Sequence, residues 1–166
     1  MYFKFISFLK FLIKSTNQHG VHSPFVFNYV TKCLYSKQKW GKAKSINILL
    51  KSIAYFNYKH IELDGNQDLN SLLRIHFPNT VIGGNTIDLV YAEELEIDTL
   101  KQLFSEGKLH NNSMIFINSI HQTAKKQKLW RKLVELPIVT VSIDMFHCGV
   151  LFIRKEQVKE HFTIRI

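Results

Sequence analysis

The chain has 166 residues, 46% of them hydrophobic and 21% charged, which predicts one globular domain with a sizeable core and excludes a disordered chain. It contains no run of about 20 apolar residues, so we expect no membrane-spanning helix. Its two cysteines, Cys33 and Cys148, match no metal-binding or redox spacing and are expected to be buried thiols in a reducing cytoplasm.

The formal net charge of +9 is unevenly distributed along the sequence. Residues 1–61 contain ten lysines and no acid, residues 62–106 carry a net charge of −7, and residues 107–166 carry +6. A basic surface could face nucleic acid or a membrane. Arginines number only four and no aromatic-basic RNA motif is present, so we expect a solvated basic surface and no nucleic-acid partner.

Residues 1–15 predict an amphipathic helix, because Lys4, Ser7, Lys10 and Lys14 recur on one side at steps of three and four. The rest of the circumference is apolar: Phe3, Phe5, Ile6, Phe8, Leu9, Leu12 and Ile13. We expect so wide an apolar face to be buried. The body of the protein is the favoured surface for it, and a membrane surface is the alternative.

The next segment, NQHGVHSPFVF at residues 17–27, contains two histidines and the start of a helix. Pro24 suits the first turn of a helix that runs to about residue 35, with Ser23 as its cap. His19 and His22 could bind a metal, but no third ligand lies near them in the sequence, so we assign them a structural or substrate-lining role. With a further helix at 45–55, residues 1–57 form a helical segment that precedes an α/β core at 58–166.

The core opens with a strand at 60–63, the turn Asp64-Gly65-Asn66, and apolar residues at helical spacing up to residue 77. A strand, tight turn and helix begin an open α/β sheet, in which ligands bind at the carboxyl ends of strands. A nucleotide-like cofactor is therefore expected over residues 64–68. An ordinary turn is the alternative, since the loop has a single glycine. A calcium loop at this position lacks its glycine and closing glutamate.

The remaining segments complete a sheet and its helices: strands at 80–82, 87–91 and 113–118, helices at 95–106 and 123–136, a hairpin of 138–144 and 148–154, and an edge strand at 161–166. This alternation predicts a three-layer α/β domain with a mainly parallel sheet of six or seven strands and a C-terminal antiparallel hairpin. Trp130 shares a helix face with Leu129 and Leu133, which predicts that it belongs to the core.

The element order, the segment NQHGVHSPFVF, the strand IELDG and the run TVSIDMFHCGVLFIRKEQ resemble class I S-adenosylmethionine-dependent methyltransferases, and among them a compact bacterial group. The resemblance implies a Rossmann-like fold, S-adenosylmethionine as cofactor, and methyl transfer to an acceptor that the sequence does not identify. It also implies that Glu62, Asp64, Gly65 and Asn66 bind the cofactor.

Four landmarks of that family are altered together. The first loop has one glycine, the ribose-holding acid at the end of the family's second strand is absent and about one βα unit is missing, Ala92-Glu93 replaces an Asp-Gly pair, and Asn118-Ser119 replaces paired aspartates. We therefore expect S-adenosylmethionine to bind weakly or not at all. Two hypotheses remain: a methyltransferase, or a non-catalytic remnant that serves as a binding or partner module.

His121 is the remaining candidate for a catalytic base, because an imidazole ordinarily titrates near neutral pH. The alternative for His121 is a helix-capping or solvent-facing histidine.

Overall fold

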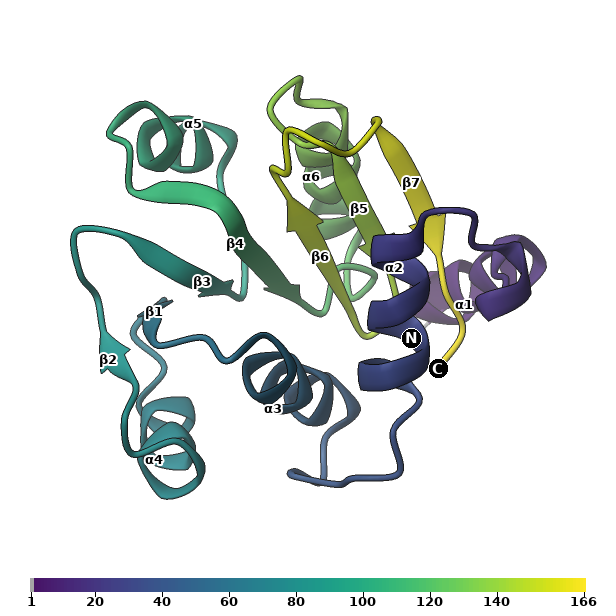
Figure 1. Ribbon diagram of the computed structural model, residues 1–166. Coiled ribbons are helices and arrows are strands. Elements are labelled where there is room, and N and C mark those ends of the chain that lie inside the picture. The colour runs from purple at the N-terminus through teal and green to yellow at the C-terminus, as the bar shows by residue number, and fades with distance from the viewer. Residues whose placement is uncertain (1) are drawn as a thin grey trace.

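The computed structural model describes residues 2–166 and contains a seven-stranded sheet with helices on both faces (Figure 1). The strand order is β2-β1-β3-β4-β6-β5-β7, and neighbouring strands are parallel except where β6 takes part. The strands are β1 (His60–Leu63), β2 (Val81–Ile82), β3 (Ile87–Ala92), β4 (Leu109–Asn118), β5 (Val141–Asp144), β6 (Cys148–Phe152) and β7 (Glu160–Thr163). The helices are α1 (Tyr2–Lys14), η1 (Gln18–Gly20), α2 (Pro24–Asn28), η2 (Tyr29–Leu34), α3 (Lys44–Phe56), α4 (Gln67–His76), α5 (Ile97–Ser105) and α6 (Ala124–Glu135). The predicted three-layer, Rossmann-like α/β fold is confirmed, with β5 and β6 as its antiparallel hairpin.

The side chains of each strand alternate between two apolar cores, one on each face of the sheet. In β4, Met114 and Phe116 belong to the core formed with α2, η2, α3 and α4, whereas Ile115 and Ile117 belong to the core formed with α5 and α6. Trp130 of α6 is 6% exposed within this second core. The prediction that Trp130 belongs to the core is therefore confirmed.

Strand β6 carries a glycine directly against Trp130. A Cβ atom added to Gly149 would lie 2.5 Å from Cη2 of the indole, well inside van der Waals contact. The backbone of Gly149 does not have a positive φ, so the requirement for glycine comes from space and not from backbone conformation. The six-membered ring of the indole can approach the strand this closely because position 149 has no side chain.

The connection from β2 to β3 is unusually short. Both strands pair in parallel with β1, one on each side of it, and residues 83–86 alone join them. Parallel strands are ordinarily joined through a helix. Here Gly83 and Gly84 make the crossover with φ of +80° and +134°, conformations open to glycine. Strand β2 is therefore present, and no helix follows it before β3.

Helix α2 begins as predicted at Pro24, and the Ser23 hydroxyl accepts a hydrogen bond from the Val26 N–H at 3.4 Å. The winding becomes π-helical at Tyr29 and ends at Leu34, close to the predicted end. The Tyr29 side chain is fully buried, and its hydroxyl hydrogen-bonds the Ser52 hydroxyl of α3 at 2.7 Å. This bond ties the π-helical segment to its neighbour.

Helix α1 forms as predicted, but the body of the protein covers little of it. Only Ser7 and Phe11 are buried, while Phe5 is 60% exposed and Ile13 is 85% exposed. The expectation that the body buries the wide apolar face is therefore wrong for most of that face. The 13-residue helix contacts the body through only one side, so most of its wide apolar face stays exposed.

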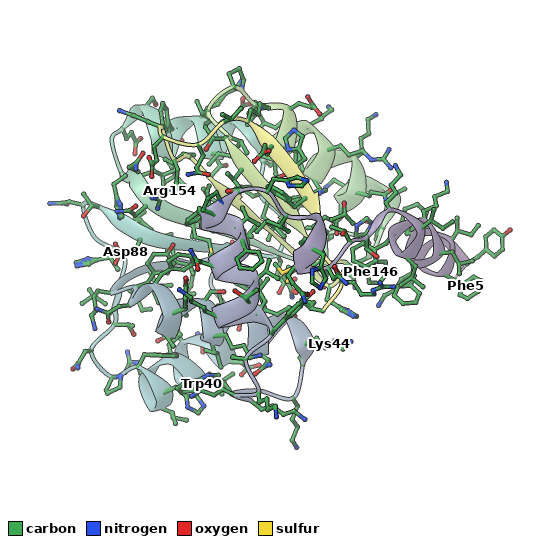
Figure 2. All side chains as sticks on the ribbon, turned by 45° about the vertical axis from the view of Figure 1, so that its right-hand side comes forward. Phe5, Trp40, Lys44, Asp88, Phe146 and Arg154 are labelled. Atoms are coloured by element: carbon green, nitrogen blue, oxygen red, sulfur yellow. The ribbon has the colours of Figure 1, made fainter. Side chains whose placement is uncertain are left out.

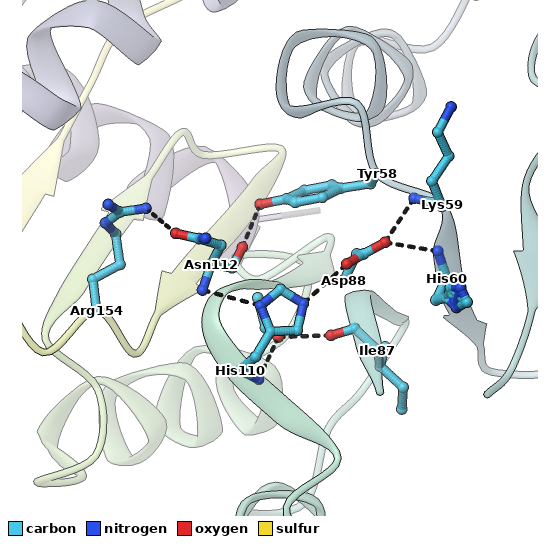
Figure 3. A network of polar contacts seen from close by, with 9 residues as sticks. Tyr58, Lys59, His60, Ile87, Asp88, His110, Asn112 and Arg154 are labelled. Carbon is cyan, nitrogen blue, oxygen red and sulfur yellow. Dashed lines mark hydrogen bonds and ion pairs between the residues drawn. The ribbon is translucent and has the colours of Figure 1, made fainter. Parts of the chain in front are cut away.

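Strand β4 begins four residues earlier than predicted, because it contains a bulge opposite Asp88 of β3. Ile87 pairs with Leu109, whereas Leu89 pairs with Met114, so residues 110–112 are extra residues on the β4 side. Figure 3 shows that His110 and Asn112 of this bulge join a polar network at the amino end of the sheet. The Tyr58 hydroxyl donates to the Asn112 carbonyl at 3.0 Å, and Arg154 donates to the Asn112 side chain at 2.7 Å.

Asp88 is the centre of this network. Its carboxylate accepts the backbone N–H groups of Lys59 and His60 at 2.7 and 2.8 Å, and it lies 2.9 Å from Nε2 of His110 (Figure 3). Burial alone would raise the pKa of Asp88, but these hydrogen bonds outweigh burial and lower the pKa below its ordinary value of 3.8. The ionised carboxylate therefore stabilises the folded chain.

We expect Asp88→Asn to lower the free energy of unfolding by about 1 kcal/mol at neutral pH, because the amide can accept fewer of these bonds. A carboxyl with a depressed folded-state pKa contributes stability above its unfolded pKa and loses it as the pH falls through the folded value. The difference between the two proteins should therefore shrink from about pH 5 to about pH 2. Urea unfolding across this range measures it. Asp98→Asn, at an exposed position of α5, is the control, and a pH-independent difference for Asp88→Asn would contradict the assignment.

Candidate functional site

From β1 the chain passes through α4 to β2 on one side of β1 and then crosses back to β3 on the other side. In open α/β sheets, ligands bind outside the carboxyl ends of the strands at such a switch point. A cavity of about 350 Å³ lies here and extends along the side of the sheet where the β2–β3 connection has no helix. Its lining residues include Glu62, Asp64, Glu94 and Glu96, with Lys108 as the one basic residue among them.

Two of the four predicted cofactor-binding residues, Glu62 and Asp64, line this cavity together. Gly65 and Asn66 do not line it. Gly65 takes φ of +65° in the turn, and the Asn66 side chain accepts a hydrogen bond from the Leu69 N–H at 2.9 Å as the cap of α4. The turn therefore forms the start of α4 and positions Asp64, whereas Glu62 is held by β1.

A second polar cluster, which the sequence did not reveal, joins the ends of β3 and β4. The Tyr91 hydroxyl donates to Oε1 of Glu93 at 2.5 Å, and the Asn118 amide donates to the same oxygen at 2.9 Å. Burial, followed by the Glu93 carboxylate, raises the pKa of Tyr91. Lys126 of α6 lies 3.6 Å from the other Glu93 oxygen. The sequence held one sign of this cluster, namely a polar residue at the end of each of two buried strands.

His121 lies between the end of β4 and the hairpin, and it is 8% exposed. Its Nε2 donates to Oδ2 of Asp144 at 2.7 Å, and its Nδ1 accepts from the Gln127 amide at 2.8 Å. The alternative of a helix-capping or solvent-facing histidine is wrong, since His121 is buried and Thr123 caps α6. Both ring nitrogens already have protein partners.

Phe146 holds the imidazole of His121 from one side. The two rings stack with centroids 5.1 Å apart and planes 12° from parallel. Phe146 has φ of +65°, an uncommon conformation for a bulky residue. A cavity of about 160 Å³ lies beside this pair and is also lined by Lys4, Lys44 and His147. Burial, then the charges of Lys44 and Lys4, lowers the pKa of His147.

The two cavities are distinct, and the other predicted residues line neither of them. His19 and His22 are both exposed, and neither lines the Glu62 cavity or the His121 cavity. Within residues 2–166, no group of three or more His, Cys, Asp or Glu side chains is arranged to hold a metal ion.

Comparison with known proteins adds a structural likeness. No family model matches the chain, and no curated protein matches it. Among solved structures, the chain is similar to the crystal structure of a "putative caffeoyl-CoA O-methyltransferase from Staphylococcus aureus", at 12% identity and a TM-score of 0.44, over 82% of this chain and 94% of that chain. The strand order defines the chain as an open α/β protein. The cavity at the switch point defines a candidate ligand site between β1 and β3.

Proposed function

We propose that this chain is a methyltransferase-like protein that binds S-adenosylmethionine weakly at the cavity of Glu62 and Asp64. The observation that carries the proposal is the charge of this cavity. Glu62, Asp64, Glu94 and Glu96 face it with Lys108 as the one base among its lining residues, in a chain whose net charge is +9. S-adenosylmethionine carries positive charge on its sulfonium and ammonium groups, which such a cavity attracts.

The residues present fit this cofactor in part. Glu62 and Asp64 would hold its ammonium group or ribose hydroxyls, and Val90 and Leu95 of the cavity wall would contact its adenine. Gly84 lines the same wall and permits close approach because it has no side chain. Gly65 and Asn66 would contribute through the turn that positions Asp64. When bound, the cofactor supplies an activated methyl group.

His121 is the proposed base for an acceptor bound in its own cavity, which is distinct from the cavity of Glu62. Asp144 accepts a hydrogen bond from its Nε2, which orients the ring and would stabilise its protonated form. The Gln127 amide must leave Nδ1 before that nitrogen can take a proton from an acceptor. His19 and His22 are given no part in this site, since they line neither cavity.

A non-catalytic binding module is the second candidate function. The observation that favours it is the double engagement of His121, whose two nitrogens are bound by Asp144 and Gln127. The crossover at Gly83 and Gly84 also takes the place of the βα unit that carries the ribose-holding acid in the resembled family.

Titration calorimetry with S-adenosylmethionine and S-adenosylhomocysteine tests the proposal. Each lost hydrogen bond to a ligand is worth roughly 0.5–3 kcal/mol, so three or four altered landmarks could remove about 4–6 kcal/mol. A loss of this size carries a micromolar site to a dissociation constant of about 1 mM or weaker. We expect Glu62→Ala to weaken binding further, and Glu135→Ala, at an exposed position of α6, to leave it unchanged.

Two results would contradict weak binding. A low micromolar dissociation constant that is lost in Glu62→Ala would establish a fully formed cofactor site and favour the enzyme. The absence of any heat at about ten times the expected dissociation constant would show that the cofactor no longer binds, leaving the binding module.

A further inference from the structure

The outward side of α1 is apolar, although the outward side of a helix packed on a protein is ordinarily polar. Tyr2, Phe5, Leu9 and Ile13 share one side by helical spacing and are 79%, 60%, 45% and 85% exposed. Phe11, on the opposite side, is buried. Figure 2 shows Phe5 at the outer end of α1, away from the rest of the molecule. We call these four residues the outer face of α1.

The other side of α1 carries positive charge without a compensating acid. Lys4, Lys10 and Lys14 lie on α1 outside the outer face, and none of them forms an ion pair within residues 2–166. Lys44 lines the same cavity as Lys4. Residues 1–61 contain ten lysines and no acidic residue. An apolar stripe on one side and lysines on the other form the pattern of a helix that lies in the interface of a bilayer.

The partner that fits this arrangement is anionic lipid. Exposed aromatic and aliphatic side chains enter the boundary between headgroups and acyl chains, and lysines near the surface bind negatively charged headgroups. A second copy of the chain fits less well, because a symmetric contact would bring together two helices that each carry three lysines and no acid. No helix within residues 2–166 is long and apolar enough to cross a bilayer, so the contact is peripheral.

We infer that α1 binds this chain to the surface of a membrane that contains anionic lipids. The outer face inserts, and the lysines of α1 contact the headgroups. The His121 cavity lies on the same side of the molecule, since Lys4 lines it and Phe11 of α1 packs against His121 with ring centroids 6.3 Å apart. Binding to a membrane therefore brings this cavity close to the lipid surface.

Co-sedimentation with vesicles tests the inference. We expect the wild-type chain to sediment with vesicles of phosphatidylcholine and phosphatidylglycerol, and at least about tenfold less with phosphatidylcholine alone, because the lysines supply part of the affinity. Binding should fall as salt is raised from about 0.1 M to 1 M, since the Debye length shortens from about 10 Å to 3 Å. Equal sedimentation with both lipids, or none with either, would overturn the inference.

Introducing negative charge into the outer face provides the matched comparison. Phe5→Glu with Ile13→Glu should reduce sedimentation about tenfold or more, since charged side chains are costly to insert. Ile75→Glu with Val158→Glu makes the same change at residues that are 72% and 79% exposed elsewhere, and should leave sedimentation unchanged. An equal loss in both pairs would overturn the role of α1.

Analytical ultracentrifugation without lipid tests the alternative that a second copy of the chain covers the outer face. A wild-type dimer that Phe5→Glu with Ile13→Glu converts to a monomer would identify the outer face as a contact between copies and overturn the inference. We expect a monomer in both cases. The lipid preference of the wild-type chain decides the question even if a variant fails to fold.

Discussion

Replacing Trp130 with alanine is expected to lower the free energy of unfolding by about 3–5 kcal/mol, the usual cost of truncating a buried tryptophan. The side chain is 6% exposed and packs in the core between the sheet, α5 and α6. Small domains are held by roughly 5–15 kcal/mol in total, so the variant should contain little folded protein near 37 °C. Circular dichroism during urea and thermal unfolding measures this loss.

Lys128→Ala is the matched control for Trp130→Ala, because it removes an exposed side chain of the same helix and should change the stability by less than about 0.5 kcal/mol. For a chain of this size, the expected loss corresponds to a decrease in melting temperature of about 10 °C. A Trp130→Ala protein that melts within about 2 °C of the parent would show that the indole is not a core side chain.

Replacing Gly149 with alanine should also destabilise the chain, by about 1–3 kcal/mol, as overpacking of a core does. The new Cβ would lie 2.5 Å from Cη2 and 2.6 Å from Cζ3 of Trp130. The backbone conformation itself accepts alanine, since Gly149 is not at positive φ. The cost should therefore depend on the indole and not on the strand.

A double-mutant cycle isolates this dependence. Phenylalanine lacks the outer ring of tryptophan, so Gly149→Ala should cost about 1 kcal/mol less in a Trp130→Phe background than in the parent. Urea unfolding of the four proteins gives the coupling energy. Additive effects of the two substitutions would mean that the clash with Trp130 is not the source of the cost.

Local periodicity was sufficient to predict the elements that pack by one face. The spacing of Leu129, Trp130 and Leu133 places them toward the sheet, and the structure confirms this for α6. The cap at Ser23 and the hairpin of β5 and β6 were likewise predicted, since capping and alternation depend on neighbours in sequence.

The features that depend on distant residues could not be predicted in the same way. His121 and Asp144 are 23 residues apart, and their bond exists because β4 and β5 end at the same edge of the sheet. The polar cluster of Tyr91, Glu93 and Asn118 has the same origin. The exposure of α1 depends on how much of the body lies beneath it, which periodicity does not report.

The two-residue length of β2 has a consequence for association between chains. An edge strand presents unpaired backbone N–H and C=O groups that can template the addition of another strand, the first step of many aggregation reactions. In β2, Val81 and Ile82 are 52% and 43% exposed, so its side chains would favour such addition. The strand stops at Gly83, however, where φ of +80° turns the backbone out of the extended line. Too few backbone groups remain in register for a second chain to extend the sheet at this edge.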